Sequence, residues 1–146
     1  LARGPAAPER RARRASRPTG RRTRHAPGAI EGAIYRYAID LERTRRVGYT
    51  PEERDRAERL TREWAATWLP DSVDWIRVSG GENPRLAVRL SEAGLTPEDA
   101  LLRISFGRID EGRDTIFERI DKGYTGFKDA VRQVQEFRRR DRAAGT

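Results

Sequence analysis

Apolar residues recur every three or four positions along most of the chain beyond residue 28, and this period predicts amphipathic helices. The stripe is clearest near the C-terminus, where one face carries Phe127, Ala130, Val131, Val134 and Phe137. Proline and glycine interrupt the pattern at short intervals, so the helices are short. The predicted helices cover residues 29–46, 51–68, 97–105, 110–121 and 126–140, and a further short helix begins at Pro84.

Two internal stretches are less regular. Residues 71–78 fit a short helix that Asp71 could cap, but Trp75 and Val78 could equally mark an extended segment. The helix is favoured. Residues 79–82, Ser-Gly-Gly-Glu, are expected to form the loosest internal loop, because two adjacent glycines leave the backbone few steric restrictions.

The three tryptophans fall on predicted core positions. Trp64 and Trp68 continue the apolar face of the helix over 51–68, and Trp75 belongs to the stretch that follows. We expect all three to be buried. The alternative is that exposed indoles stack on nucleic-acid bases.

A three-residue phrase, Gly-apolar-Thr, occurs at residues 48–50, 94–96 and 123–125. Glycine accepts the positive φ that ends many helices, the apolar residue packs back on the last turn, and threonine caps the next helix. Thr50-Pro51-Glu52-Glu53 has the sequence of a full capping box, and Thr96-Pro97-Glu98-Asp99 has that of a weaker one because Asp replaces Glu or Gln. The phrase therefore predicts tight helix-to-helix corners.

Composition divides the chain of 146 residues into two parts, an arm over 1–28 and a helical domain over 29–146. The arm holds nine arginines and one glutamate, which account for the whole net charge of +8, and the remaining residues hold equal numbers of basic and acidic groups. The arm has too few apolar residues to offset its chain entropy, so we expect it to be disordered when free. An Arg-rich, acid-poor start is also typical of an organellar transit peptide.

Arginines without interleaved aromatic residues suit contacts with phosphates and not with base edges. A second basic cluster ends the last predicted helix, where cations also favour the negative end of the helix dipole. The alternative interpretation of the arm is a solubilising extension, and anionic lipid is a weaker candidate partner because no apolar anchor is present. The candidate nucleic-acid-binding residues are Arg10, Arg11, Arg13, Arg14, Arg17, Arg21, Arg22, Arg24, Arg138, Arg139, Arg140 and Arg142.

Catalytic chemistry finds little support in the sequence. The chain has no cysteine and one histidine, His25 in the arm, so a zinc site or a histidine-based triad is not expected. Asp110, Asp114 and Glu118 would share one face of the helix predicted over 110–121, an arrangement that suits a magnesium-dependent enzyme. A solvated helix face explains the same spacing, and no glycine-rich phosphate loop is present. No catalytic residue, metal or cofactor is therefore expected.

A helix-turn-helix is a further candidate, between Leu86 and Ile104 around the corner at Gly94. Its second helix would begin with Glu98 and Asp99, two carboxylates that DNA would repel. A structural corner is the favoured interpretation.

We therefore predict an all-α fold of six or seven short helices behind a basic arm. The layout, a basic Pro/Arg arm, a helix start at Pro27-Gly28 and then short helices, resembles that of small DNA-packaging or DNA-binding proteins of actinobacterial phages. The leading function is non-enzymatic nucleic-acid binding, with DNA favoured over RNA and no membrane partner. The alternative is an assembly protein, such as a virion component, that docks on a protein partner or on a second copy. We expect a cytoplasmic protein, or a virion protein if its origin is a phage.

Overall fold

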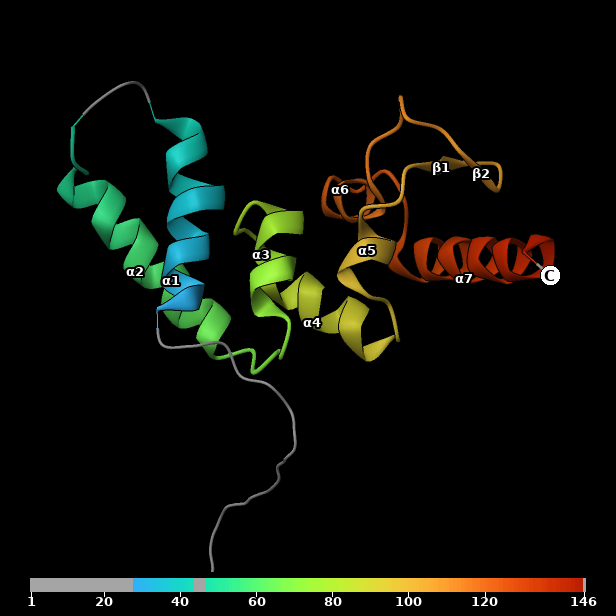
Figure 1. Ribbon diagram of the computed structural model, residues 1–146, viewed down its shortest axis with the longest axis horizontal. Helices are drawn as coiled ribbons and strands as arrows, with labels where there is room; N and C mark the ends of the chain where they lie inside the picture. The colour runs from blue at the N-terminus through green and yellow to red at the C-terminus, as the bar shows by residue number, and fades with distance from the viewer. Residues whose placement is uncertain (1–27, 44–46, 146) are drawn as a thin grey trace, which may run out of the picture.

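The computed structural model describes residues 28–43 and 47–145, so almost all of the predicted arm lies outside the described part. Helices dominate the described residues, and the prediction of an all-α fold of short helices is confirmed (Figure 1). The order along the chain is α1 (Ala29–Ile34), α2 (Pro51–Ala65), α3 (Ser72–Ser79), α4 (Pro84–Glu92), α5 (Pro97–Ala100), β1 (Ile104–Ser105), β2 (Arg108–Ile109), α6 (Ile116–Asp121) and α7 (Phe127–Ala144).

The first helical run is longer than α1. It continues as a π-helical segment, Tyr35–Ile39, and a 3-10 segment, Asp40–Glu42. The predicted helix over 29–46 is thus present to residue 42, and residues 44–46 lie outside the described part. Its inward face buries Ile34 and Ile39 against α2 and α3.

Helix α3 lies at the centre of the molecule, between the α1–α2 pair and the C-terminal helices (Figure 1). It contacts α1, α4, α5 and α6, and its side chains Trp75 and Ile76 are fully buried. Residues 71–78, which fitted either a short helix or an extended segment, are therefore mostly helical, as favoured. Gly80 then adopts a positive φ and ends the helix.

Trp68 is not in the core, and this prediction was wrong. Helix α2 ends at Ala65, three residues earlier than predicted, and Trp68 then takes a positive φ of 59°. Its side chain is 67% exposed, whereas Trp64 is fully buried. The helical period stops with the helix, so it no longer places Trp68 on the buried face.

The predicted helix over 97–105 was also wrong in its second half. Helix α5 has only four residues, and the chain then forms an antiparallel hairpin in which Ile104 pairs with Ile109 and Ser105 with Arg108. The hairpin lies beside α7 (Figure 1), and the amide of Ile116 donates to the carbonyl of Leu102 below it. Short apolar runs do not distinguish a helix from a strand by period alone.

Helix α6 begins at Ile116 and not at Asp110, because Thr115 and Glu118 form a capping box that fixes the start. This box was not predicted. Asp110 and Asp114 therefore precede the helix, and the predicted acidic face over Asp110, Asp114 and Glu118 does not form.

The loop over 79–82, predicted to be the loosest internal loop, makes side-chain contacts with α2. The indole Nε1 of Trp64 donates a buried hydrogen bond of 2.8 Å to the carbonyl of Gly81, and Arg56 forms an ion pair with Glu82. One residue further on, the side chain of Asn83 caps α4 through the amide of Leu86 at 3.2 Å. Two glycines permit an unusual backbone path, but packing fixes that path.

The three predicted corners all carry a glycine with positive φ, at Gly48, Gly94 and Gly123. Thr50 and Thr96 each head a complete capping box, as predicted. At the third corner the capping prediction was wrong: Gly126 is the N-cap of α7, and the preceding Thr125 accepts a hydrogen bond from a buried arginine, described below.

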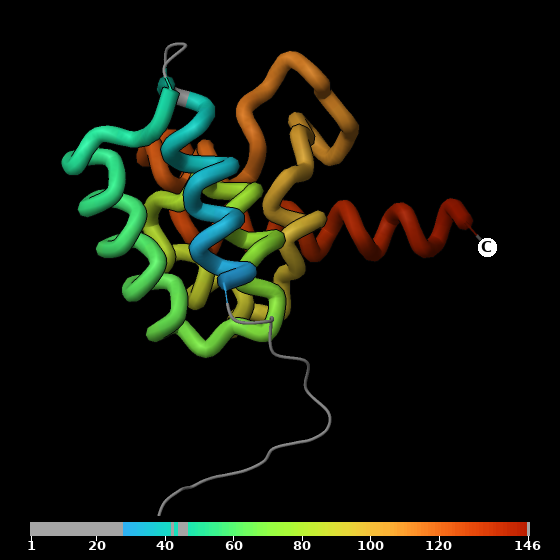
Figure 2. The backbone as a smooth tube through the Cα atoms, turned by 60° about the vertical axis from the view of Figure 1, so that its left-hand side comes forward, coloured from blue at the N-terminus to red at the C-terminus, as the bar shows by residue number. Residues whose placement is uncertain are grey.

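Helix α7 is the longest helix of the described residues and extends four residues beyond its predicted end. Its first half packs against the domain through Ala130 and Val134, and its second half projects away from the body (Figure 2). The hairpin and α7 together form the end of the molecule opposite α1 and α2.

Candidate nucleic-acid interface

The predicted arginines divide between two locations. The eight in the arm lie outside the described residues, and the four near the C-terminus lie on the projecting half of α7. Successive residues of a helix point about 100° apart, so these four do not form one surface. Each must be placed by its own contacts.

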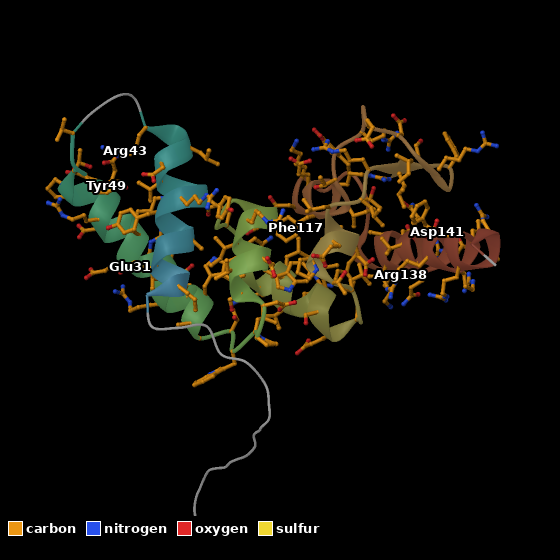
Figure 3. All side chains as sticks on the ribbon, viewed as in Figure 1. Glu31, Arg43, Tyr49, Phe117, Arg138 and Asp141 are labelled. Atoms are coloured by element: carbon orange, nitrogen blue, oxygen red, sulfur yellow. The ribbon has the colours of Figure 1, made fainter. Side chains whose placement is uncertain are left out.

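Arg138 faces the body of the domain. Its Nη1 lies 3.1 Å from the carboxylate of Asp99, and Figure 3 shows Arg138 on α7 where it leaves the domain. The same carboxylate accepts the amide of Thr96 in the capping box of α5. Arg138 therefore ties α7 to α5, which leaves less of its charge for an external phosphate.

Arg139 and Arg142 are exposed on the projecting part of α7, close to Asp141. Arg140 points instead towards the hairpin. A Cβ placed on Gly107 would overlap its Nη1 and lie 3.5 Å from its Cζ, so the guanidinium rests against the hairpin turn. Arg140 also lines the pocket beneath this turn.

This pocket, of about 450 Å³, lies between the hairpin, the start of α6 and α7. It brings together three arginines from different segments, Arg113, Arg119 and Arg140, with the polar side chains of Gln133 and Glu136 from α7. Residues 133, 136 and 140 share one face of α7 because they are three and four positions apart. No ion pair among the described residues joins Glu136 to these arginines.

Arg119 forms the floor of the pocket and is only 8% exposed. Its Nη1 donates to the carbonyl of Ile104 at 3.0 Å, and its Nε donates to the hydroxyl of Thr125 at 3.2 Å. No described carboxylate forms an ion pair with it. Burial lowers the pKa of Arg119, and the positive charge of Arg113 lowers it further. The pocket thus contains a buried guanidinium that donates its hydrogen bonds to neutral oxygens and not to a carboxylate.

The hairpin turn borders the same pocket. It consists of Phe106 and Gly107, with φ of 51° and 78°, and positive φ at both central residues is the mark of a type I′ turn. Phe106 also lines the pocket, yet its side chain is 99% exposed. A solvent-exposed aromatic residue therefore borders the same pocket as three arginines.

Sequence reasoning did not identify Phe106, Arg113 or Arg119 as candidates. The arginines were taken as part of a solvated charged face, because the sequence placed both on one predicted helix. The available signal was the pair Phe106-Gly107 with an isoleucine two positions away on each side, Ile104 and Ile109, which fits a two-residue hairpin. Phenylalanine is an uncommon first residue in such a turn, so the signal is weak.

The acidic residues of the candidate metal site have other local roles. Asp110 accepts the amide of Gly112 at 3.1 Å, Asp114 pairs with Lys122 at 3.2 Å, and Glu118 serves the capping box. The hydrogen bond from Lys122 to Asp114 raises the pKa of Lys122. Within residues 28–43 and 47–145, no group of three potential ligands is placed to hold a metal ion.

The opposite end of the molecule carries an aromatic cluster around Tyr49, which Figure 3 labels together with Arg43. The rings of Tyr35 and Tyr49 have centroids 4.6 Å apart, and the guanidinium of Arg43 lies 4.2 Å from the Tyr49 centroid. The Tyr49 hydroxyl donates to Asp40 at 2.8 Å, which raises the pKa of Tyr49. These contacts connect the first helical run to the start of α2, so they explain the cluster as a structural corner.

The candidate helix-turn-helix lacks a recognition helix that could enter a DNA groove. The would-be recognition helix, α5, is one turn long, and Asp99 at its start is buried and paired with Arg138. Such a helix presents too few side chains to read a groove.

None of the helices in the described part of the chain is both long and apolar enough to cross a bilayer. A comparison of the chain with family models, curated proteins and solved structures finds no match.

Proposed function

We propose that this protein binds nucleic acid, with DNA favoured over RNA, through phosphate contacts and without catalysing a reaction on it. The observation that carries the proposal is the separation of charge: residues 1–28 hold the entire net charge of +8. A concentrated cationic segment attracts a polyanion over a long range, and a neutral domain does not. The arm would supply most of the affinity.

The exposed arginines of α7 support a second set of phosphate contacts. Arg139 and Arg142 are on the part of the helix that projects into solvent. They would act as point contacts that orient the domain on the nucleic acid, because phosphate contacts carry no direct sequence information. Binding of this kind suits a protein of the cytoplasm or of a virion.

The test is the salt dependence of duplex DNA binding. If about six arm arginines reach phosphates, the plot of log K against log salt concentration should have a slope of about −5. Replacing all nine arm arginines by glutamine should flatten the plot to a slope of magnitude about 2 or smaller, since only the α7 contacts remain. Duplexes of unrelated sequence should bind within a few-fold of one another.

Two results would contradict the proposal. Unchanged affinity in the glutamine variant would remove the arm from the interface. Absence of DNA binding by the unaltered chain would favour the alternative, an assembly protein whose helical domain docks on a protein partner or a second copy. Melting curves of both proteins control for folding.

A further inference from the structure

The pocket between the hairpin and α7 is not explained by packing. Its three arginines come from the segment before α6, from α6 and from α7, so three separate segments place positive charge around one pocket. Neighbouring cations repel one another, and burial increases that cost because water is excluded. For Arg119 the lowered pKa expresses the same penalty. An anion in the pocket would remove it.

Phe106 presents a second unexplained cost beside the first. A bulky residue with positive φ is strained, and its exposed ring gains nothing from burial. Asparagine, aspartate or glycine would satisfy a type I′ turn at lower cost. Backbone strain at an exposed aromatic is a feature of ligand-contacting sites.

Charge and aromatic surface next to one another fit one ligand better than others. A nucleotide carries a phosphate and a planar base on the same unit, and proteins that bind single strands combine cationic grooves with aromatic rings on which bases stack. A base in a duplex is already stacked on both sides, so an exposed ring can reach only an unpaired base. A free phosphate would use the arginines and leave Phe106 without a role.

We propose that this pocket binds a single-stranded segment of nucleic acid, with a phosphate among Arg113, Arg119 and Arg140 and the adjacent base stacked on Phe106. The inference rests on the proposed nucleic-acid binding and adds to it a preference for unpaired strands. Arg119 is held in place by Ile104 and Thr125, so its guanidinium is oriented before the ligand arrives. Arg140 reaches the pocket from α7 and lies against the turn that carries Phe106.

The experiment uses the full chain and fluorescence anisotropy with two labelled probes, a short single-stranded deoxythymidine oligonucleotide and a duplex of equal length. Phe106→Asn should weaken single-strand binding about tenfold, the range expected for one lost stacking contact, and leave duplex binding unchanged. Phe106→Trp should retain single-strand affinity, because it keeps an aromatic face. Tyr124→Asn, which removes another exposed ring outside the pocket, should have no effect.

The arginines offer a matched pair on adjacent positions. Arg140→Gln should weaken single-strand binding severalfold more than Arg139→Gln, although both remove one charge from the same turn of α7. Arg119 is left intact in these tests, because replacing it would also break its hydrogen bonds to the hairpin and to Thr125. Melting curves confirm that each variant is folded.

Three outcomes would overturn the inference. Single-strand affinity unchanged in Phe106→Asn would remove the base platform. Equal effects of Arg139→Gln and Arg140→Gln would show that only overall charge matters. The third outcome uses inorganic phosphate as a competitor of the single strand. If phosphate competes equally well in the unaltered chain and in Phe106→Asn, and only Arg140→Gln weakens this competition, the pocket binds a free phosphate. In each case the salt-dependent binding through the arm can still hold, so the two proposals fail separately.

Discussion

Among the residues that the structure describes, two pairs of consecutive residues have positive φ, Gly80-Gly81 and Phe106-Gly107. The first pair connects α3 to α4 in the interior, and the second forms the tip of the hairpin in solvent. The backbone makes a similar demand at both places, but the sequence meets it differently. Comparing the residues at the two places separates those that packing explains from those that it does not.

At the interior pair, structure alone explains the sequence. Gly81 is buried, a Cβ there would lie 2.8 Å from the Cβ of Ala38, and its carbonyl accepts the indole N–H of Trp64. Glycine is required both for the dihedral angle and for the close approach of the first helical run. Every feature of this loop has a partner inside the fold.

At the hairpin tip, structure explains Gly107 but not Phe106. The ring is exposed, and its backbone angle is one that glycine or asparagine adopts more easily. The fold would be at least as stable without it. The comparison therefore singles out Phe106 as a residue that the described fold does not explain, and the proposed base contact would give it a role.

The largest effect is expected from Gly81→Ala. The methyl group overlaps Ala38, and the positive φ adds strain, so the free energy of unfolding should fall by about 2–4 kcal/mol. Urea denaturation measures it. Gly94→Ala is the control, because a Cβ there meets nothing within 4 Å and only the strain of about 1 kcal/mol remains. Equal losses in the two variants would mean that packing does not fix the interior loop.

Gly107→Ala should have an intermediate effect. A methyl group would overlap the guanidinium of Arg140, but that is the far end of a flexible side chain and can move. The loss should therefore be close to that of Gly94→Ala, about 1 kcal/mol from strain alone. Moving Arg140 should also weaken single-strand binding. A loss as large as that of Gly81→Ala would show that Arg140 is rigidly held.

How far the sequence predicted this molecule depends on whether the determining contacts were local. The capping boxes at Thr50 and Thr96 and the glycines of the corners depend on neighbours within a few residues, and they were predicted correctly. The end of α2 before Trp68 and the division of residues 97–105 into α5 and β1 depend on distant packing. Hydrophobic period does not contain that information.

The candidate site shows the same limit more strongly. Charge counting identified the arm and the arginines of α7, but it could not distinguish Arg138, which pairs with Asp99, from Arg140, which faces the pocket. The two are separated by about 200° around the helix, and the orientation of α7 on the domain decides which is which. Arg119 is on α6 and meets Arg140 only through the tertiary fold.

The smallest and most informative effect is expected from Phe106→Asn. Asparagine takes positive φ more readily than phenylalanine and is a preferred first residue of a type I′ turn, so the hairpin should gain about 0.5 kcal/mol. Because the ring is 99% exposed, its removal forfeits almost no buried area. Thermal and urea denaturation of the full chain, compared with Tyr124→Asn, would measure the change. If Phe106→Asn is more stable yet binds single strands less tightly, Phe106 lowers stability and favours binding. Gly81 is the opposite case, because glycine is the residue that stabilises the fold at that position. If Phe106→Asn instead destabilises the protein by as much as Gly94→Ala, the ring has a structural contact and the contrast between the two turns is lost.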